Sequence, residues 1–256
     1  MQNLEYKEFP SPHVRIENFL SIPASKECLA EAQSLEYAFA PAGIMGNTAD
    51  GPDNSDGCEE CEANQAITRT GIRQNDVVYM DSHYSNRRHE SKILGHLKSV
   101  LTSSSLSTAF NELPFLFPII NQTTHMETIL SSYGMCDFYG WHRDANPAEF
   151  GSRIITCVLH WNTEPQQFEG GELILAGKTI EDQLPYSPVH NTAIFFQSNQ
   201  CLHAVDATVF EGDFKDSRFS INAWLGFETV DRGNPYFVGG RSVNYRPAST
   251  IPDMVR

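Results

Sequence analysis

Hydrophobic and polar positions follow different periods in the two halves of this chain. In the first half, apolar residues recur three and four positions apart over about Ala24 to Phe39, and again from Glu90 to about Ser103. This spacing places them on one face of a helix, so we expect two amphipathic helices. A short strand is expected over residues 13–21, and the Gly-, Asp- and Asn-rich stretch from Gly43 to Asn64 is expected to be a long loop.

From Met126 onward the pattern changes to short β-like runs separated by Gly, Pro, Asn and Asp. The runs are METILSSY, CDFYGWH, RIITCVLHW, GELILA, NTAIFFQS, LHAV and RFSINAWLGF. Many short strands bounded by turn residues predict a sandwich or barrel. Helices first and strands afterwards indicate an α+β chain. We therefore expect a double-stranded β-helix (jelly-roll) core with N-terminal supporting helices.

A length of 256 residues suits a single domain, which we expect to cover 1–256. Within it, residues 1–125 would supply helical support, 126–228 the jelly-roll core, and 229–256 a C-terminal tail with little pattern. The loop 43–64 has two interpretations, a lid over the active site and a disordered excursion.

Charge, the distribution of apolar residues and the cysteine count indicate which binding partners and which cellular location to expect. The formal net charge of −14 argues against nucleic acid, since Lys and Arg supply most of the affinity for phosphates. The N-terminal region has interspersed charges and no long apolar run, so we expect no membrane association and a cytoplasmic location. Six cysteines form no disulfide framework at this length, and Cys136, Cys157 and Cys201 are expected to be reduced and buried.

The segment YGWHRDA contains a candidate pair of metal ligands, His142 and Asp144. Residues i and i+2 of a strand project from the same face, so the imidazole and the carboxylate would converge. In a chain with nine histidines such a pair also arises by chance. His203 follows an apolar strand and a polar turn, from where it can reach the same site; its alternative is a hydrogen-bonded core histidine. Two His and one carboxylate on one octahedral face are the ligand set of non-haem Fe(II) oxygenases.

Arg218 opens the run RFSINAWL fifteen residues after His203. Strand alternation puts it on the more polar face of that run, with Ser220, Asn222 and Trp224. Its planar guanidinium would suit the distal carboxylate of a dicarboxylic acid. Read in isolation, a surface arginine at the start of a strand is an equally good interpretation.

The stretch from about Tyr133 to Phe227 resembles the catalytic core of the prolyl 4-hydroxylase-like 2-oxoglutarate oxygenases, and especially the PKHD-type hydroxylases. Tyr133 and Tyr139 precede His142, and the runs RIITCVLHWN, GGELIL, AIFF, LHAV and RFSINAW follow in the order of that family. The resemblance covers roughly 95 residues, and the N-terminal region resembles the helical support of the family only loosely.

The resemblance implies a role for each matching residue. His142, Asp144 and His203 match the iron ligands, and Arg218 matches the residue that binds the C5 carboxylate of 2-oxoglutarate. The remaining matches are co-substrate contacts: Tyr133, and Thr156 and His160 on one face of a strand. His160 departs from the family pattern, in which an aromatic or apolar residue is common. Its role is left between a second carboxylate partner and a packed histidine.

The resemblance further implies an enzyme that uses Fe(II), 2-oxoglutarate and O2 to hydroxylate an unactivated C–H bond, releasing succinate and CO2. Asp144 favours oxygen transfer over halogenation, since related halogenases carry Gly or Ala there. Trp224 stands where nucleic-acid demethylases of the superfamily usually have a second arginine. A small molecule, such as an amino acid or a natural product, is the expected substrate.

Three alternatives stand beside this function. The first is a peptidyl, prolyl-type hydroxylase. The second is a non-catalytic metal-binding jelly-roll sensor, for which Arg218 would be unnecessary. The third is a zinc-dependent hydrolase, for which the sequence shows no evident general base.

Overall fold

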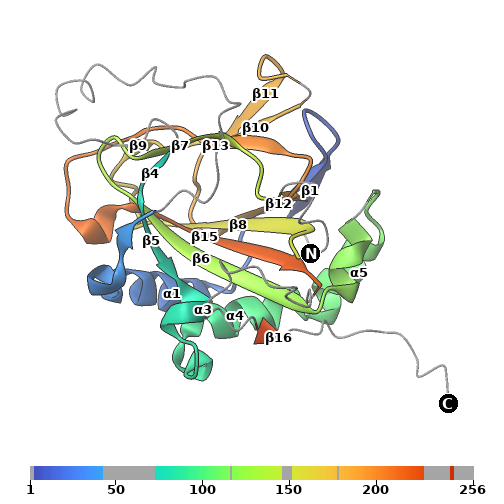
Figure 1. Ribbon diagram of the computed structural model, residues 1–256, viewed down its shortest axis with the longest axis horizontal. Coiled ribbons are helices and arrows are strands. Elements are labelled where there is room, and N and C mark those ends of the chain that lie inside the picture. The colour runs from blue at the N-terminus through green and yellow to red at the C-terminus, as the bar shows by residue number, and fades with distance from the viewer. Residues whose placement is uncertain are drawn as a thin grey trace, which may run out of the picture.

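The structure, a computed structural model, describes residues 3–42, 73–115, 117–145, 152–177 and 179–227, together with the backbone of 243–244. Two facing antiparallel sheets form its centre, and helices cover one side (Figure 1). No helix among these residues is long and apolar enough to cross a membrane.

The larger sheet carries the long strands of the chain. Its neighbouring strands are β1 (Leu4–Lys7), β2 (His13–Ile16), β12 (Thr192–Gln197), β8 (Ile155–Trp161), β15 (Arg218–Gly226), β6 (His125–Tyr133), β5 (Asp76–Tyr79) and β3 (Ala40–Pro41), and β16 (Val243–Asn244) also pairs with β6.

The smaller sheet lies opposite the larger one. Its neighbouring strands are β11 (Gln183–Tyr186), β10 (Leu173–Ala176), β13 (Leu202–Val205), β7 (Phe138–His142) and β4 (Arg73–Gln74), and a separate pair joins β14 (Thr208–Val209) to β9 (Glu169–Gly170). Side chains from both sheets meet in a buried cluster that includes Val158, Ile194 and Phe196 from the larger sheet and Leu173 and Leu175 from the smaller. Two antiparallel sheets packed in this way form the expected jelly-roll core.

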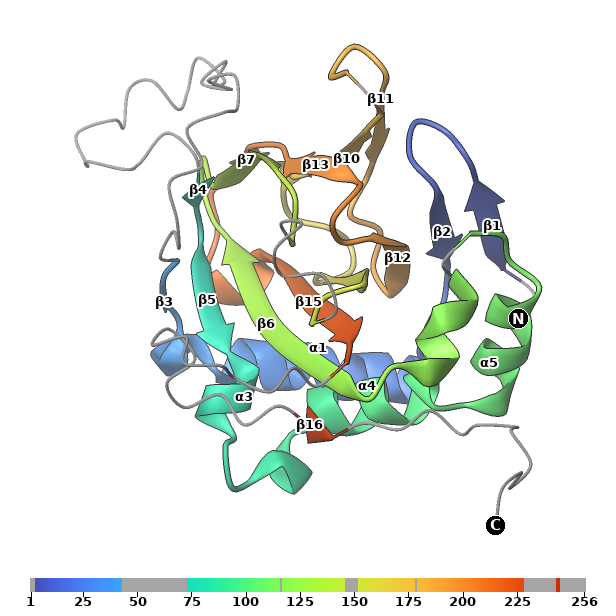
Figure 2. The ribbon, with the colours of Figure 1, turned by 45° about the vertical axis from the view of Figure 1, so that its right-hand side comes forward.

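Helices cover the outer face of the larger sheet (Figure 2). They are α1 (Ile22–Ser34), α3 (Met80–His83), α4 (Lys92–Leu101) and α5 (Ser104–Asn111), with 3-10 turns η1 (Glu36–Ala38), η2 (Arg88–Glu90), η3 (Phe117–Gln122) and η5 (Phe214–Asp216). Serine side chains cap the three longer helices: Ser21, Ser91 and Ser103 each accept a hydrogen bond from a backbone N–H three residues on. Such caps satisfy donors that a helix N-terminus otherwise leaves unpaired.

Strict alternation along β15 separates two environments. Phe219, Ile221, Ala223 and Leu225 are buried against the helical layer, within the largest apolar cluster. Arg218 begins the opposite face, which points between the sheets. The alternation predicted for this run is confirmed, and it directs the polar face of the larger sheet toward the smaller one.

Most predicted elements are present, with shifted ends. The first helix ends at Ser34 and the second covers Lys92–Leu101. The strand predicted over residues 13–21 stops at Ile16, and Asn18 then adopts a positive φ of 50°. Each of the seven β-like runs contains a strand. The elements that were not predicted are α3, α5, β1, β3, β4, β5, β9, β11, β14 and β16. The loop 43–64 and the tail 229–256 lie outside the described residues, apart from the backbone of 243–244.

One cysteine prediction was wrong. Cys157 and Cys201 are free and buried, as expected, but Cys136 is disulfide-bonded. Cys136 lies in the turn between β6 and β7, where it is only half-buried and has a positive φ of 61°. The apolar residues around it in the sequence suggested a strand interior that this turn does not provide.

Candidate metal centre and anion pocket

Two strands of the smaller sheet bring the candidate metal ligands together. His142 ends β7, and the antiparallel pairing of β7 with β13 places His203 directly opposite it. Asp144 follows two residues after His142, and its backbone N–H donates to the Ser198 carbonyl at 3.0 Å. The ligand atoms of the three residues all lie within 4.8 Å of one another. All three side chains are buried, so water competes little for them.

Hydrogen bonds at the far side of each ring orient the two imidazoles. Nδ1 of His142 donates to the Gly140 carbonyl at 2.8 Å, and Nδ1 of His203 donates to the Cys201 carbonyl at 3.2 Å. Because a carbonyl only accepts, the proton sits on Nδ1 and the Nε2 lone pair is free to bind a metal. Nε2 of His142 is buried and has no hydrogen-bond partner among the residues that the structure describes. Burial lowers the pKa of His203 to about 4, which keeps that ring neutral.

The Asp144 carboxylate is held from the larger sheet. Thr156 on β8 donates its hydroxyl to Oδ2 of Asp144 at 2.7 Å, and the Ser198 hydroxyl lies 2.9 Å from that of Thr156. The guanidinium of Arg153 donates to the Asp144 carbonyl at 3.1 Å. Burial alone would raise the pKa of Asp144, but His203, His142 and Thr156 together lower it below its ordinary value. Asp144 is therefore an anion facing two imidazole nitrogens, at 3.6 Å from His142 and 3.5 Å from His203.

Aromatic rings restrict the movement of both imidazoles. Tyr139 stacks on His142 with ring centroids 3.5 Å apart and planes 14° from parallel. The Arg73 guanidinium lies 4.4 Å from the centroid of the Tyr139 ring. Phe196 packs against His203 with centroids 4.6 Å apart. Packing of this kind holds ligand side chains near one geometry before a metal binds.

Arg218 forms a second polar centre between the sheets. It is fully buried, its Nε donates to the Gly171 carbonyl at 2.7 Å, and one Nη lies 3.3 Å from the Ser220 hydroxyl. Within the described part of the chain, no carboxylate forms an ion pair with it. Burial lowers the pKa of Arg218 to about 10, which still leaves the group charged at neutral pH. A buried cation without a counter-ion is costly, and an anionic ligand would supply the missing charge.

Gly171 makes room for the arginine. Its φ is +71°, and a Cβ placed there would lie 2.6 Å from Cδ of Arg218 and 2.7 Å from a methyl carbon of Thr208. A larger residue would therefore displace the Arg218 side chain. The hydrogen bond between the Gly171 carbonyl and Arg218 was not predicted from the sequence.

Tyr133 and His160 complete the surroundings of Arg218. The guanidinium carbon lies 4.5 Å from the centroid of the Tyr133 ring, and one Nη lies 3.5 Å from Nδ1 of His160. Because arginine only donates, Nδ1 accepts and the proton of a neutral His160 sits on Nε2. Burial, with Arg218 and Arg15 nearby, holds the pKa of His160 well below its usual range. Its Nε2 is buried and has no hydrogen-bond partner in the described part of the chain.

The seven predicted site residues therefore lie in two adjoining centres. The candidate metal centre contains His142, Asp144, His203 and Thr156, and the anion pocket contains Arg218, Tyr133 and His160. Strand β8 links them, because Thr156 contacts Asp144 and His160, on the same face, contacts Arg218. Thr156 and His160 are four positions apart, which corresponds to about 13 Å along an extended strand. Sequence reasoning missed Ser198 and Arg153, whose contacts with Asp144 and Thr156 depend on packing between segments and leave no local signal.

Comparison with known proteins gives a family match to the part of the chain that contains both centres. Residues 128–226 match the model of the 2OG-Fe(II) oxygenase superfamily. The chain is 28% identical over 181 residues to a protein of Synechocystis sp. named an uncharacterized PKHD-type hydroxylase. That match covers 64% of this chain and spans only 59% of the length of the relative.

Solved structures with similar folds include two prolyl hydroxylases. One is a prolyl-4-hydroxylase of Pseudomonas putida, at 18% identity and a TM-score of 0.54, covering 84% of this chain and 92% of that one. Another is a Trichoplax adhaerens prolyl hydroxylase in complex with a peptide of hypoxia inducible factor, at 18% identity and a TM-score of 0.57, covering 84% and 83%. The epimerase SnoN of nogalamycin biosynthesis is similar at 11% identity and a TM-score of 0.51, covering 85% and 79%. At these identities the likeness shows the jelly-roll fold alone.

The hydrogen bond from Thr156 to Asp144 generates a prediction about metal affinity. Thr156→Val keeps the shape of the side chain and removes the donor, so Co(II), a spectroscopic substitute for Fe(II), should bind about 10- to 100-fold more weakly. Chelator competition monitored by Co(II) absorption measures this. Thr192→Val is the matched control, because the buried Thr192 hydroxyl has no hydrogen-bond partner within the described ranges. Equal affinities for the two variants would show that Thr156 does not hold the carboxylate.

Proposed function

We propose that this chain, whose residues 128–226 match the model of the 2OG-Fe(II) oxygenase superfamily, is a member of that family and hydroxylates an unactivated C–H bond of a small molecule, such as an amino acid or a natural product. Fe(II), 2-oxoglutarate and O2 are the cofactor and co-substrates of this family. The observation that carries the proposal is the pairing of two centres, a His142–Asp144–His203 ligand set beside a buried, uncompensated Arg218. Neither centre alone separates an oxygenase from a metal-binding protein without activity.

The ligand set fits Fe(II). Two imidazoles and one carboxylate, with the Nε2 of His142 buried and unpartnered, form the donor set that non-haem iron oxygenases use. When bound, Fe(II) supplies the oxidising chemistry by which 2-oxoglutarate and O2 give succinate, CO2 and a hydroxylated product. Backbone carbonyls orient the two imidazoles, Thr156 fixes the carboxylate, and burial excludes water.

Arg218 would bind the C5 carboxylate of 2-oxoglutarate. Its unused N–H groups are donors for a charge-assisted contact, and burial makes that contact strong. Tyr133 would pack beside the same carboxylate, and His160 would donate from Nε2, the nitrogen for which the described residues offer no partner. Of the two roles left open for His160, this geometry favours the carboxylate partner over the packed histidine. A sensor or a zinc hydrolase would not need this anion pocket.

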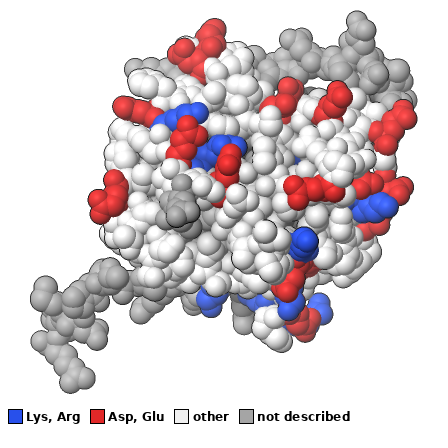
Figure 3. All heavy atoms as spheres, turned by 180° about the vertical axis from the view of Figure 1, so that it is seen from behind, with Lys and Arg blue, Asp and Glu red and all other residues white. Residues whose placement is uncertain are grey.

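The substrate class is a separate part of the proposal. Acidic side chains predominate over basic ones on the face shown in Figure 3, and the net charge is −14, which disfavours nucleic acid and anionic membranes. We favour a small molecule over a peptide because no basic or repeat-bearing partner surface is evident in the sequence. The fold does not separate them, since the similar structures include prolyl hydroxylases and an epimerase from nogalamycin biosynthesis. We also propose a single domain and a cytoplasmic location.

The ligand assignment predicts a spectroscopic signal. Anaerobic protein with Fe(II) and 2-oxoglutarate should show a weak visible metal-to-ligand charge-transfer band, since the 2-oxo acid chelates the metal. His142→Ala or His203→Ala should abolish the band, because each removes one of three protein ligands. His96→Ala is the control, because this partly exposed histidine pairs with Glu27 on the helical layer. A normal band in both ligand variants would refute the assignment.

The anion pocket predicts a specific loss of co-substrate affinity. Arg218→Met removes the charge-assisted contact at a cost on the order of 2–4 kcal/mol, or roughly 30- to 1000-fold in the Kd of 2-oxoglutarate. Co(II) affinity should stay nearly unchanged, which separates this effect from unfolding. The control Arg87→Met removes an exposed arginine that pairs with Glu90. A change below about threefold would mean that another residue, with His160 and Tyr133 as candidates, holds the carboxylate.

The substrate proposal is tested with labelled oxygen. The enzyme with Fe(II), 2-oxoglutarate and 18O2 is incubated in parallel with a small-metabolite extract and with a peptide pool from the same cells. Mass spectrometry should find one 18O atom in a small-molecule product, with succinate formed in step. Label only in the peptide arm would favour the peptidyl alternative and leave the oxygenase assignment intact. A chlorinated product would contradict the expected role of Asp144.

A further inference from the structure

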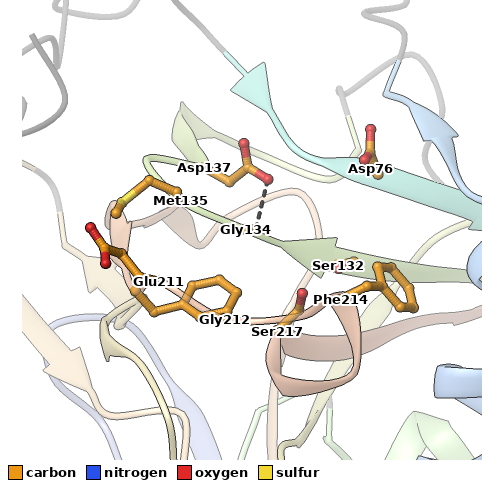
Figure 4. A pocket seen from close by; sticks show the side chains of 10 residues that line it. Asp76, Ser132, Gly134, Met135, Asp137, Glu211, Gly212, Phe214 and Ser217 are labelled. Atoms are coloured by element: carbon orange, nitrogen blue, oxygen red, sulfur yellow. Dashed lines mark hydrogen bonds between the residues drawn. The ribbon is translucent and has the colours of Figure 1, made fainter. Parts of the chain in front are cut away.

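A cavity of about 500 Å³ lies at the end of the jelly roll where β6 finishes and β15 begins. The turn after β6 and the loop before β15 form its walls (Figure 4). Its volume falls within the range of small-ligand sites. The lining residues are Asp76, Ser132, Gly134, Met135, Asp137, Phe210, Glu211, Gly212, Phe214 and Ser217. None of them is among the residues assigned above to the metal centre or the anion pocket.

The charge of this cavity is opposite to that of the Arg218 pocket. Three carboxylates line it, from Asp76, Asp137 and Glu211, and no Lys, Arg or His is among its lining residues. Asp137 accepts a hydrogen bond from the Gly134 N–H at 2.7 Å. Asp76 and Glu211 form no ion pair with any residue that the structure describes. Two of the three carboxylates therefore have no counter-ion among the described residues.

Two nearly buried serines also line the cavity. Ser132 is 4% exposed and Ser217 is 3% exposed. Within the described ranges, neither side chain is hydrogen-bonded, and Figure 4 shows both among the residues of the cavity wall. Polar groups at this depth are normally paired. These hydroxyls are independent of the acidic residues and can accept hydrogen bonds from a bound donor.

Aromatic rings complete the wall. Phe214 is held in place by Phe39 and Phe219, with ring centroids 5.2 and 5.3 Å apart. Phe210 also lines the cavity, and a Cβ added to Gly212 would come within 2.9 Å of the Phe210 ring. Aromatic faces beside carboxylates attract a cation that carries an apolar stem.

We propose that this cavity binds an organic cation: an ammonium or guanidinium group on an aliphatic stem, presented by a free amine or by the basic side chain of a peptide. Carboxylates and serine hydroxyls accept its N–H bonds, and the phenylalanines contact its stem. Ser217 lines this cavity and the next residue in the chain, Arg218, forms the anion pocket, so the two sites are neighbours in the fold.

Nuclear magnetic resonance titration tests the proposal on the full chain. Zn(II), a diamagnetic metal, and 2-oxoglutarate are added first, so that the candidate metal centre and the Arg218 pocket are occupied. The backbone amide signals of Gly134 and Gly212 then report binding in the cavity. The probes are cadaverine, blocked lysine (Nα-acetyl-lysine methylamide) and the uncharged blocked norleucine. We expect both cations to shift these amides with a Kd on the order of 1 mM, and blocked norleucine to bind at least about tenfold more weakly. Tighter binding of cadaverine would identify a free amine as the source, and tighter binding of blocked lysine a peptide side chain.

Variants assign the binding to this cavity. Glu211→Gln and Asp76→Asn should each weaken cation binding about threefold, and the double variant about tenfold. Glu181→Gln, an equally exposed carboxylate outside the cavity, should leave binding unchanged. Equal binding of blocked norleucine, no shift from either cation, or wild-type affinity in the double variant would each overturn the proposal. The reporters are amide shifts rather than turnover, so such a failure would not bear on the oxygenase function.

Discussion

The antiparallel pairing of β7 with β13 is the constraint on which the candidate site depends. It sets His203 directly opposite His142, so two residues far apart in the sequence present their rings to the same point. A shift of one residue in this register would turn His203 away from the site, since strand side chains alternate between faces. Backbone carbonyls then orient both rings, and Tyr139 and Phe196 limit their rotation.

A second constraint is the division of the larger sheet into an apolar and a polar face. Along β15 and β8 the apolar residues pack against the helices, which frees the other face for Arg218, Thr156 and His160. The helical layer is therefore part of how the site is built, although it contributes no ligand. The free energy gained by burying the apolar face offsets the cost of keeping charged groups between the sheets.

The charges between the sheets are arranged as two unequal centres. At the smaller sheet, the Asp144 carboxylate faces the imidazoles of His142 and His203, which suits a divalent cation. Toward the start of β15, Arg218 is a buried cation whose described neighbours include no ion-pair partner, which suits an anion. A dicarboxylic acid that chelates a metal at one end is complementary to both. The complementarity, rather than the jelly roll itself, is the physical basis of the proposed activity.

Local pattern was enough to predict several features of this protein. Periodicity located α1, α4 and the strands after Met126, and alternation alone put Arg218 on the polar face. The spacing of His142 and Asp144 indicated a shared face, and the family resemblance added His203. Tertiary structure decided the rest. The hydrogen bond from Thr156 to Asp144, the carbonyl of Gly171 beside Arg218 and the tautomer of His160 all depend on segments distant in sequence. The physical reason is that periodicity reports only which face of an element is buried. Which strands become neighbours, and in what register, is determined by packing across the whole domain.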